Sequence, residues 1–253
     1  MRNSKKNDFY FLRKVDLCPA DDLRPKTSFP PEASGSDRSG GDMIKAVLWD
    51  MDGTLVDSED IAVDALGLAM TEAGLTPPTD LKERVVGRSS DDIYRYVVET
   101  FGLKASPTDW ERRKHYFYFR AAGALRGYDD AIETWRRFDA VGIRQAVISN
   151  SDRAIMDVNL RAAGLVRPGL ITVARNDVLH GKPHPEGYLR AAYLLGVNPS
   201  ECIIVEDSVS GAAAAEAAGI ETVFVPHSHS KAPQGVRTLC SMRLFGDEIL
   251  ARR

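Results

Sequence analysis

The sequence predicts an α/β protein whose core is a doubly wound, Rossmann-like parallel sheet, with an inserted α-helical cap domain. Short apolar runs of strand length alternate with helical stretches, and several of these runs stop at polar or acidic residues. Strands that are apolar on both faces belong to buried parallel sheets, and alternation of strand with helix is typical of doubly wound layers. The third observation is that no clear strand signal occurs between Asp57 and about Leu125, which predicts the helical cap.

The core elements follow this alternation along the chain. Strands are expected over residues 46–49, 146–148, 170–173, 202–205 and 222–225. Helices are expected over residues 131–141, 153–163, 186–195 and 211–218. Each of these helices is followed by a glycine that can adopt the left-handed cap conformation, namely Gly142, Gly164, Gly196 and Gly219.

The interval without strands contains four helical patterns, over residues 59–73, 81–86, 91–101 and 109–122. We therefore assign residues 43–57 and 126–253 to the core domain and residues 58–125 to the helical cap domain. Ligands of such sheets bind at the carboxyl ends of the strands. A cap inserted directly after the first strand is expected to act as a lid there.

Residues 1–42 have a different composition from the rest of the chain. They mix charged residues with Ser, Gly and Pro and show no sustained apolar periodicity. Such a segment buries too little apolar surface to offset the entropy of ordering it, which predicts a flexible N-terminal tail. Met43 stands just before the first strand, so a natural start at Met43 is a hypothesis.

The composition also limits the partners of the chain. The 253 residues are 43% hydrophobic and 27% charged with a formal net charge of −3, so no basic surplus favours nucleic acid. No apolar run approaches the roughly 20 residues that span a bilayer. Cys18, Cys202 and Cys240 are odd in number and widely spaced, which favours free thiols and a cytoplasmic location. Either a monomer or a homodimer is compatible with these features.

The strongest chemical signal is the segment Asp50 to Glu59, directly after the first strand, which begins Asp50-Met51-Asp52-Gly53. Two carboxylates two residues apart at a strand end can address one small volume. One of them can attack an electrophile while the other moves a proton. An acidic surface turn is the alternative interpretation, since Asp-Gly pairs are common in turns.

Two further segments could hold a phosphate. Ser149-Asn150-Ser151 follows the second core strand, and we expect it at the start of a helix, where hydroxyl and N–H groups suit an anion. Simple helix capping is the alternative. Lys182 precedes a helix start marked by Pro185, and its ammonium could neutralise a transferring phosphoryl group. The alternative there is a solvated surface lysine.

The fourth signal is Glu206-Asp207-Ser208, at the end of the fourth core strand. Paired carboxylates at a strand end suit Mg²⁺, which prefers oxygen ligands, although an acidic turn is equally compatible. Taken together, the strand ends carry a nucleophile, a proton shuttle, a phosphate clamp, a cation and metal ligands. Phosphoryl transfer needs all of these groups.

These four segments, in this order, resemble the four motifs of the haloacid dehalogenase superfamily over roughly residues 43–226. The branch that the chain resembles is the phosphoglycolate phosphatase and β-phosphoglucomutase-like one, which has a helical cap. The resemblance implies that Asp50 lies on the middle strand and attacks phosphorus to form an aspartyl phosphate. It also implies that Asp52 protonates the leaving oxygen and then activates water.

The resemblance implies binding roles for the remaining motif residues. Ser149, Asn150 and Lys182 would hold the phosphoryl oxygens. The implied Mg²⁺ site consists of Asp50, the backbone carbonyl of Asp52, Asp207 and, directly or through a neighbour, Glu206.

The cap bears on the choice of substrate. Ser89 and Asp92 have the spacing of a capping box, and the resemblance implies that this cap loop faces the leaving group, which makes Arg88 a candidate substrate contact. Mutases of the branch carry a histidine twelve residues after the nucleophile, where this chain has Ala62. That departure favours hydrolysis over isomerisation.

The expected function is therefore a Mg²⁺-dependent phosphatase that hydrolyses a small phosphorylated metabolite of the sugar phosphate or phosphoglycolate type. A β-phosphoglucomutase-like isomerase is the alternative. A dehalogenase needs neither Asp52 nor a metal. A non-catalytic protein that binds a phosphorylated ligand, or a signalling module of the receiver type, is the most distant reading.

Overall fold

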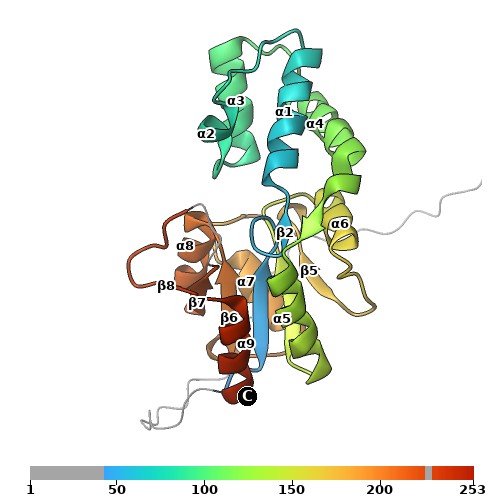
Figure 1. The fold of residues 1–253 in the computed structure, drawn as a ribbon. Helices are drawn as coiled ribbons and strands as arrows, with labels where there is room; N and C mark the ends of the chain where they lie inside the picture. Colours follow the sequence, from blue (N-terminus) through green and yellow to red (C-terminus); the bar gives the residue numbers. More distant parts are fainter. Residues whose placement is uncertain (1–42, 226–229) are drawn as a thin grey trace, which may run out of the picture. The chain divides into compact units, whose positions relative to one another are not determined.

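The computed structural model of the chain describes residues 43–225 and 230–253. Within these residues, the main sheet has six parallel strands in the order β5-β4-β1-β6-β7-β8 (Figure 1). The strands are β1 (Ala46–Asp50), β4 (Arg144–Ile148), β5 (Ile171–Val173), β6 (Cys202–Glu206), β7 (Glu221–Phe224) and β8 (Arg237–Thr238). The predicted doubly wound parallel sheet is confirmed. The predicted tail, residues 1–42 and with it Cys18, lies outside the described residues.

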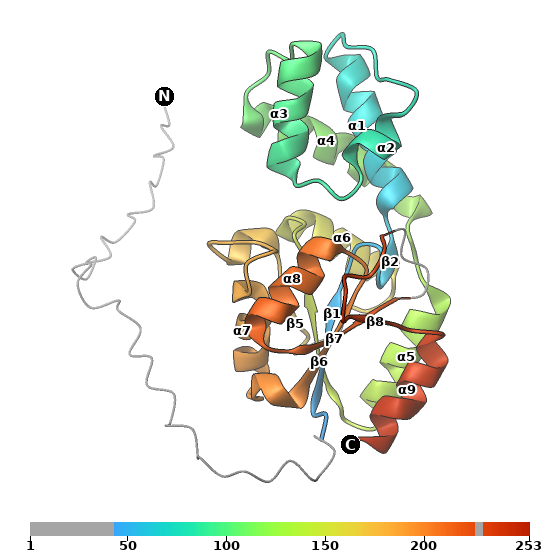
Figure 2. The ribbon, with the colours of Figure 1, turned by 90° about the vertical axis from the view of Figure 1, so that its left-hand side faces the viewer.

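Helices cover both faces of the sheet, with α5 and α9 on one side and α7 and α8 on the other (Figure 2). The core helices are α5 (Asp129–Ala140), α6 (Arg153–Ala162), α7 (Glu186–Leu195), α8 (Val209–Ala218) and α9 (Met242–Ala251). The four glycines expected at helix ends all have positive φ angles. The β8 strand and the α9 helix were not predicted.

The burial of β1 explains why its sequence is apolar throughout. Val47 and Trp49 pack in one cluster with Trp135 of α5, whereas Ala46 and Leu48 pack in a second cluster on the other face. Successive side chains of a strand point to opposite faces, so a strand covered on both sides needs apolar residues at every position. Every residue of β1 is buried, including Asp50 at its end.

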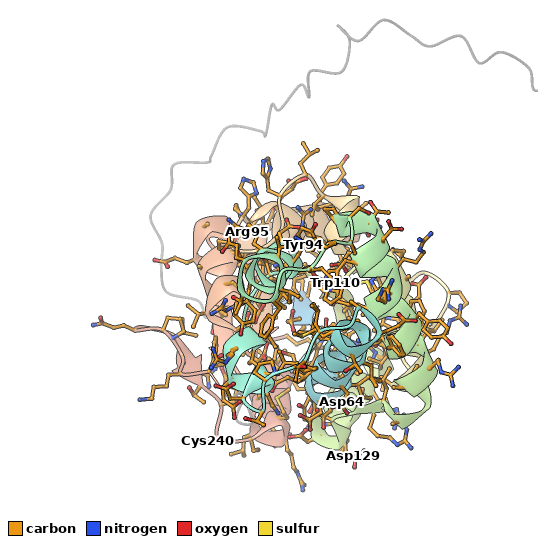
Figure 3. All side chains as sticks on the ribbon, turned by 90° about the horizontal axis from the view of Figure 1, so that it is seen from above. Asp64, Tyr94, Arg95, Trp110, Asp129 and Cys240 are labelled. Carbon is orange, nitrogen blue, oxygen red and sulfur yellow. The ribbon has the colours of Figure 1, made fainter. Side chains whose placement is uncertain are left out.

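A group of four helices, here called the helical insert, occupies the interval without strand signals. It comprises α1 (Glu59–Glu72), α2 (Leu81–Val85), α3 (Ser90–Phe101) and α4 (Pro107–Ala121). The insert has a core cluster of its own, which includes the fully buried Trp110 (Figure 3). The Ser89 side chain accepts a hydrogen bond from the N–H of Asp92, so the predicted cap of α3 is confirmed.

A two-stranded antiparallel pair, β2 (Val56–Asp57) and β3 (Arg126–Gly127), stands where the chain enters and leaves the helical insert. β2 ends at Asp57 and β3 begins at Arg126, beside the domain boundaries expected at residues 57/58 and 125/126, which stay a prediction. Short 3₁₀ turns are Ala122–Ala124, Arg175–Asp177 and Pro199–Glu201. Cys202 and Cys240 are free thiols. Across residues 43–225 and 230–253, no helix has both the length and the apolarity that a membrane span requires.

Candidate active site

The carboxyl ends of three neighbouring strands form the edge at which the motif residues gather. Asp50 is the last residue of β1 and pairs with Ile148, the last residue of β4. The neighbouring strand β6 ends at Glu206. Because the strands are parallel and in register, Ser149, Asp50 and Glu206 come to one edge of the sheet.

Lys182 lies inside this edge rather than on the surface. Its ammonium is 2.5 Å from Oδ1 of Asp50 and 2.7 Å from Oε1 of Glu206, and it also donates to the carbonyl of Ile148 at 3.2 Å. The Lys182 side chain is 5% exposed and that of Glu206 is fully buried. This lysine is therefore a buried counter-charge between two carboxylates, and the alternative of a solvated lysine is wrong.

The loop that carries Lys182 is fixed by Asn150. The Asn150 side-chain amide donates to the carbonyl of Lys182, and its oxygen accepts from the N–H of the same residue, at 3.0 and 2.8 Å. The peptide bond between Lys182 and Pro183 is cis. Because both ends of the Asn150 amide bond to the backbone of Lys182, the Asn150 side chain fixes the position of Lys182 in this structure.

Glu206 is held by hydrogen bonds on both oxygens. Oε1 accepts from the hydroxyl of Tyr188 at 2.8 Å besides Lys182. Oε2 accepts from the N–H groups of Asp207 and Ser208 and from the Ser208 hydroxyl. Burial raises the pKa of Glu206, but the Lys182 ammonium and these hydrogen bonds outweigh it, so the pKa lies below its ordinary value. Glu206 is therefore a fixed negative charge.

Tyr188 was not recognised from the sequence. It lies on the first turn of α7, three residues after Pro185, and is fully buried among apolar residues. A tyrosine on an apolar helix face is normally a packing residue, so the sequence carries no signal of its contact with Glu206.

Three carboxylates surround a small volume at this edge. One oxygen each of Asp50, Glu206 and Asp207 lies within 4.8 Å of the others. Burial is the main cause that raises the pKa of Asp50 to about 8 and that of Asp207 to about 9, with repulsion among the carboxylates adding to it. When all three carboxylates are ionised and Lys182 carries its proton, these four groups together have a formal charge of −2.

The residues present fit a divalent cation. Oδ2 of Asp50 is buried and has no hydrogen-bond partner among the described residues, and an orphaned buried oxygen calls for a ligand. The candidate metal ligands around it are carboxylate oxygens, and Mg²⁺ prefers oxygen ligands. A divalent cation would also balance the excess charge.

Gly53 makes room for this acidic group. Its φ angle is +81°, and a Cβ atom at this position would lie 2.2 Å from Oδ2 of Asp207. Both the turn and the approach of Asp207 therefore require glycine. The Asp-Gly turn predicted from the sequence is part of the site as well as a turn.

The carboxylate of Asp52 accepts hydrogen bonds from four side chains. Its Oδ1 accepts from the hydroxyl of Ser58 at 2.7 Å and from the amide of Asn159 at 2.8 Å. Its Oδ2 accepts from the hydroxyls of Ser149 and Ser151 at 2.9 and 2.8 Å. In this structure the Ser149 hydroxyl donates its hydrogen bond to Asp52. It could donate to a bound phosphate only if it turned away from that carboxylate.

Ser149 to Ser151 lie just before the helix predicted over residues 153–163, so the alternative that these residues cap the helix is wrong. Helix α6 begins at Arg153 with Asp152 as its N-terminal cap residue. The N–H of Ser151 donates to the Ser149 hydroxyl at 2.8 Å, which makes a separate turn before the helix. Hydroxyl side chains often bond to local backbone groups in this way, which favours a turn over a helix at these residues.

Asn159 and Tyr118 were also missed. The Tyr118 hydroxyl of α4 donates to the oxygen of the Asn159 side chain at 2.8 Å, and both residues are buried. A signal did exist, because Asn159 lies at helical spacing from Ile155 and Met156 on the apolar face of α6. A polar residue in an apolar stripe needs a hydrogen-bonding partner.

Arg88 lies in the turn between α2 and α3. Its guanidinium carbon is 5.2 Å from the centre of the Tyr96 ring, a stacking contact within the helical insert. Its predicted contact with substrate stays a prediction.

The fold and the edge site together define an α/β protein with a buried carboxylate at the end of its first strand and a helical insert that follows this strand in the sequence. The family description that matches is "haloacid dehalogenase-like hydrolase", over residues 44–219. This match spans more than half of the chain, so the chain belongs to the haloacid dehalogenase-like hydrolase family. The resemblance inferred from the four motifs is confirmed.

Several relatives are similar over most of this chain. The phosphoglycolate phosphatase of Rhodospirillum rubrum is 30% identical over 215 residues, which are 81% of this chain and 88% of that protein. "Protein SUPPRESSOR OF QUENCHING 1, chloroplastic" of Arabidopsis thaliana is 31% identical over 195 residues, 75% of this chain. The match covers only 18% of the Arabidopsis protein, which is thus far longer than the shared region.

A solved structure gives the same result for the fold. The crystal structure of a HAD family hydrolase from Deinococcus radiodurans, with bound phosphate and sodium, is 30% identical and superposes with a TM-score of 0.65. The match covers 83% of this chain and 97% of that one.

Proposed function

We propose that the chain is a Mg²⁺-dependent phosphatase that hydrolyses a small phosphorylated metabolite of the sugar phosphate or phosphoglycolate type through an aspartyl phosphate on Asp50. The observation that carries this proposal is the orphaned, buried oxygen of Asp50 beside Asp207, Glu206 and Lys182. The phosphatase name of the Rhodospirillum relative supports it.

In the first half-reaction, a carboxylate oxygen of Asp50 attacks phosphorus and the bond from phosphorus to the leaving oxygen breaks. Asp52 gives that oxygen a proton. The Lys182 ammonium lies 2.5 Å from the attacking carboxylate and stabilises negative charge on the phosphoryl group. Ser149 donates to a phosphoryl oxygen, and Asn150 contributes by holding the Lys182 loop.

In the second half-reaction, Asp52 accepts a proton from water, whose oxygen attacks phosphorus. The bond between phosphorus and Asp50 breaks, phosphate leaves and the carboxylate is restored. Splitting a slow hydrolysis into two displacements is the purpose of a covalent nucleophile.

When bound, Mg²⁺ would supply positive charge that offsets the negative charge of the phosphoryl oxygens. Asp50, Asp207 and the backbone carbonyl of Asp52 would be its protein ligands. Both oxygens of Glu206 already accept hydrogen bonds, so Glu206 would contribute its negative charge rather than a ligand atom. It would also position Asp207, because it accepts a hydrogen bond from the N–H of that residue. The helical insert would serve as the cap over the substrate, with Arg88 as a contact to the leaving group.

The test is a panel of phosphate esters assayed for release of free phosphate with MgCl₂ and with EDTA. We expect turnover that depends on Mg²⁺, and we expect Asp50→Asn to lower it at least a hundredfold while the thermal unfolding temperature is kept or raised. The matched control is Asp247→Asn. Asp247 is an exposed residue of α9 that pairs with Arg137 of α5, and its variant should keep full activity. Near wild-type turnover by Asp50→Asn would remove Asp50 from the mechanism, and an isomeric ester as the product would favour the mutase.

A further inference from the structure

A chain of hydrogen bonds runs from the helical insert to the carboxylate of Asp52. It begins at the Tyr118 hydroxyl on α4, passes through the side-chain amide of Asn159 on α6 and ends at Oδ1 of Asp52. Both of its donor–acceptor distances are 2.8 Å. Asn159 is fully buried and Tyr118 is 5% exposed, so water does not compete for either contact.

Asn159 differs in kind from the other partners of Asp52. The remaining three are serine hydroxyls, which can rotate and can either donate or accept. One of them, Ser149, is needed by the phosphate in the proposed reaction. The NH₂ group of Asn159 can only donate, and it stays directed at Asp52 because the amide oxygen on its other side accepts from Tyr118.

The energetics favour a positioning role over simple packing. A buried amide without partners is destabilising, whereas here both ends of the Asn159 side chain are hydrogen-bonded. A hydrogen bond to a carboxylate is stronger than one between neutral groups, and the low polarity around α6 strengthens it further. Misplacing a proton-transfer group by about 1 Å can cost about a hundredfold in rate.

We propose that Asn159 is a positioning residue for Asp52 and that Tyr118 fixes the orientation of Asn159. This inference rests on the proposed function, because it gives Asp52 the role of moving protons. Asn159 then keeps the carboxylate in place after Ser149 has turned to the phosphate. The same contact ties the proton shuttle to α4 of the helical insert.

The experiment uses p-nitrophenyl phosphate with the full chain and MgCl₂, followed by stopped-flow absorbance. p-Nitrophenolate leaves without a proton, so phosphorylation of Asp50 does not need Asp52, whereas hydrolysis of the aspartyl phosphate needs it as a base. We expect Asn159→Leu to keep the rate of the first release of p-nitrophenolate within about threefold. Its steady-state rate should fall about tenfold to a hundredfold, within the range that general base catalysis contributes.

Tyr118→Phe is the milder second variant and removes only the hydroxyl. It should lower the steady-state rate about threefold to tenfold with no change in the first release. Tyr94→Phe is the matched control, since its hydroxyl donates to the carbonyl of Ala105 within the insert at 2.9 Å, and it should leave both rates unchanged.

The outcomes separate this inference from the function on which it rests. A wild-type chain that releases no phosphate from any ester would overturn the proposed function itself. An active wild type with an unaffected Asn159→Leu, or with both rates lowered equally, would overturn only the positioning role. If Asn159→Leu does not fold, Tyr118→Phe decides, and a steady-state rate equal to that of Tyr94→Phe overturns the role.

Discussion

Gly53 shows how closely a single residue and the acidic group depend on each other. The chain turns there with φ at +81°, and Asp207 occupies the space that a side chain would need. An alanine would meet two separate difficulties, the strain of a left-handed backbone and a collision with a carboxylate oxygen. The first difficulty affects stability alone, whereas the second affects the position of a proposed Mg²⁺ ligand.

These two effects can be separated with Gly53→Ala and Gly74→Ala. Gly74 has nearly the same φ angle, +76°, but nothing lies within 4 Å of its missing Cβ. Left-handed strain should lower the free energy of unfolding by about 1–2 kcal/mol in both variants. Only Gly53→Ala should also weaken Mg²⁺ binding, by about tenfold or more, as measured by calorimetric titration. Equal Mg²⁺ affinities in the two variants would show that Asp207 is not displaced from a ligand position.

The roles of single residues divide into those with a sequence signal and those without. Asp50, Asp52 and Glu206 stand at strand ends as charged residues beside apolar runs, so their position could be predicted. Lys182 could be placed near the site, but its burial between two carboxylates could not, because that depends on where strands distant in sequence meet. Tyr188 gave no signal, since its hydroxyl is distinguished only by a tertiary contact.

At the scale of elements, helix α8 approaches the sheet edge so closely that it needs a glycine. A Cβ atom on Gly211 would lie 1.6 Å from Oε1 and 2.5 Å from Oε2 of Glu206. Glu206 cannot give way freely, because Lys182, Tyr188 and Ser208 all hold it. The glycine thus lets the first turn of α8 pack directly on a buried carboxylate.

Two glycine-to-alanine changes in helices should therefore have opposite effects. Gly67 lies inside α1, where a Cβ would make an ordinary 3.7 Å contact with Leu81, so Gly67→Ala should raise the free energy of unfolding by about 0.5–1 kcal/mol. Gly211→Ala should lower it by about 1–3 kcal/mol, because overpacking outweighs helix propensity. Urea denaturation measures both. A Gly211→Ala chain as stable as Gly67→Ala would mean that Glu206 is not fixed as described.

The elements also show what sequence patterns can and cannot specify. Helix α7 was predicted at its observed bounds, since a proline precedes it and a glycine follows it. The two-residue strands β2, β3 and β8 carry too few residues to show any alternation. The start of α6 at Arg153 was also predicted, whereas the turn that the Ser149 hydroxyl makes with the N–H of Ser151 just before it was not. Periodicity identifies long elements, whereas short ones depend on tertiary partners.

At the scale of the whole molecule, the acidic group couples stability to pH and to the cation. Burial raises the pKa of Asp50 to about 8 and that of Asp207 to about 9 in the cation-free chain, well above their values in an unfolded chain. Between the unfolded and folded values, the folded chain holds protons that the unfolded chain has released. The free energy of unfolding therefore falls as the pH rises through this window.

Mg²⁺ should reverse that loss. The cation would bind the ionised carboxylates, so protons would compete with it more strongly at about pH 5.5 than at about pH 8. Because a ligand that binds only the folded state stabilises it in proportion to its occupancy, MgCl₂ should raise the thermal unfolding temperature more at the higher pH. Scans with MgCl₂ and with EDTA at the two pH values measure this difference.

Asp207→Asn provides the matched control for that comparison. Asparagine has a similar shape but no carboxyl group that must hold a proton or bury a charge at about pH 8. The unfolding temperature of the variant in EDTA should therefore lie above that of the wild type at this pH, and its gain from MgCl₂ should largely disappear. The same gain from MgCl₂ at both pH values, or an undiminished gain in Asp207→Asn, would place the cation elsewhere. The stability of the whole chain thus reports on whether Asp50 and Asp207 share one ion, independently of any substrate.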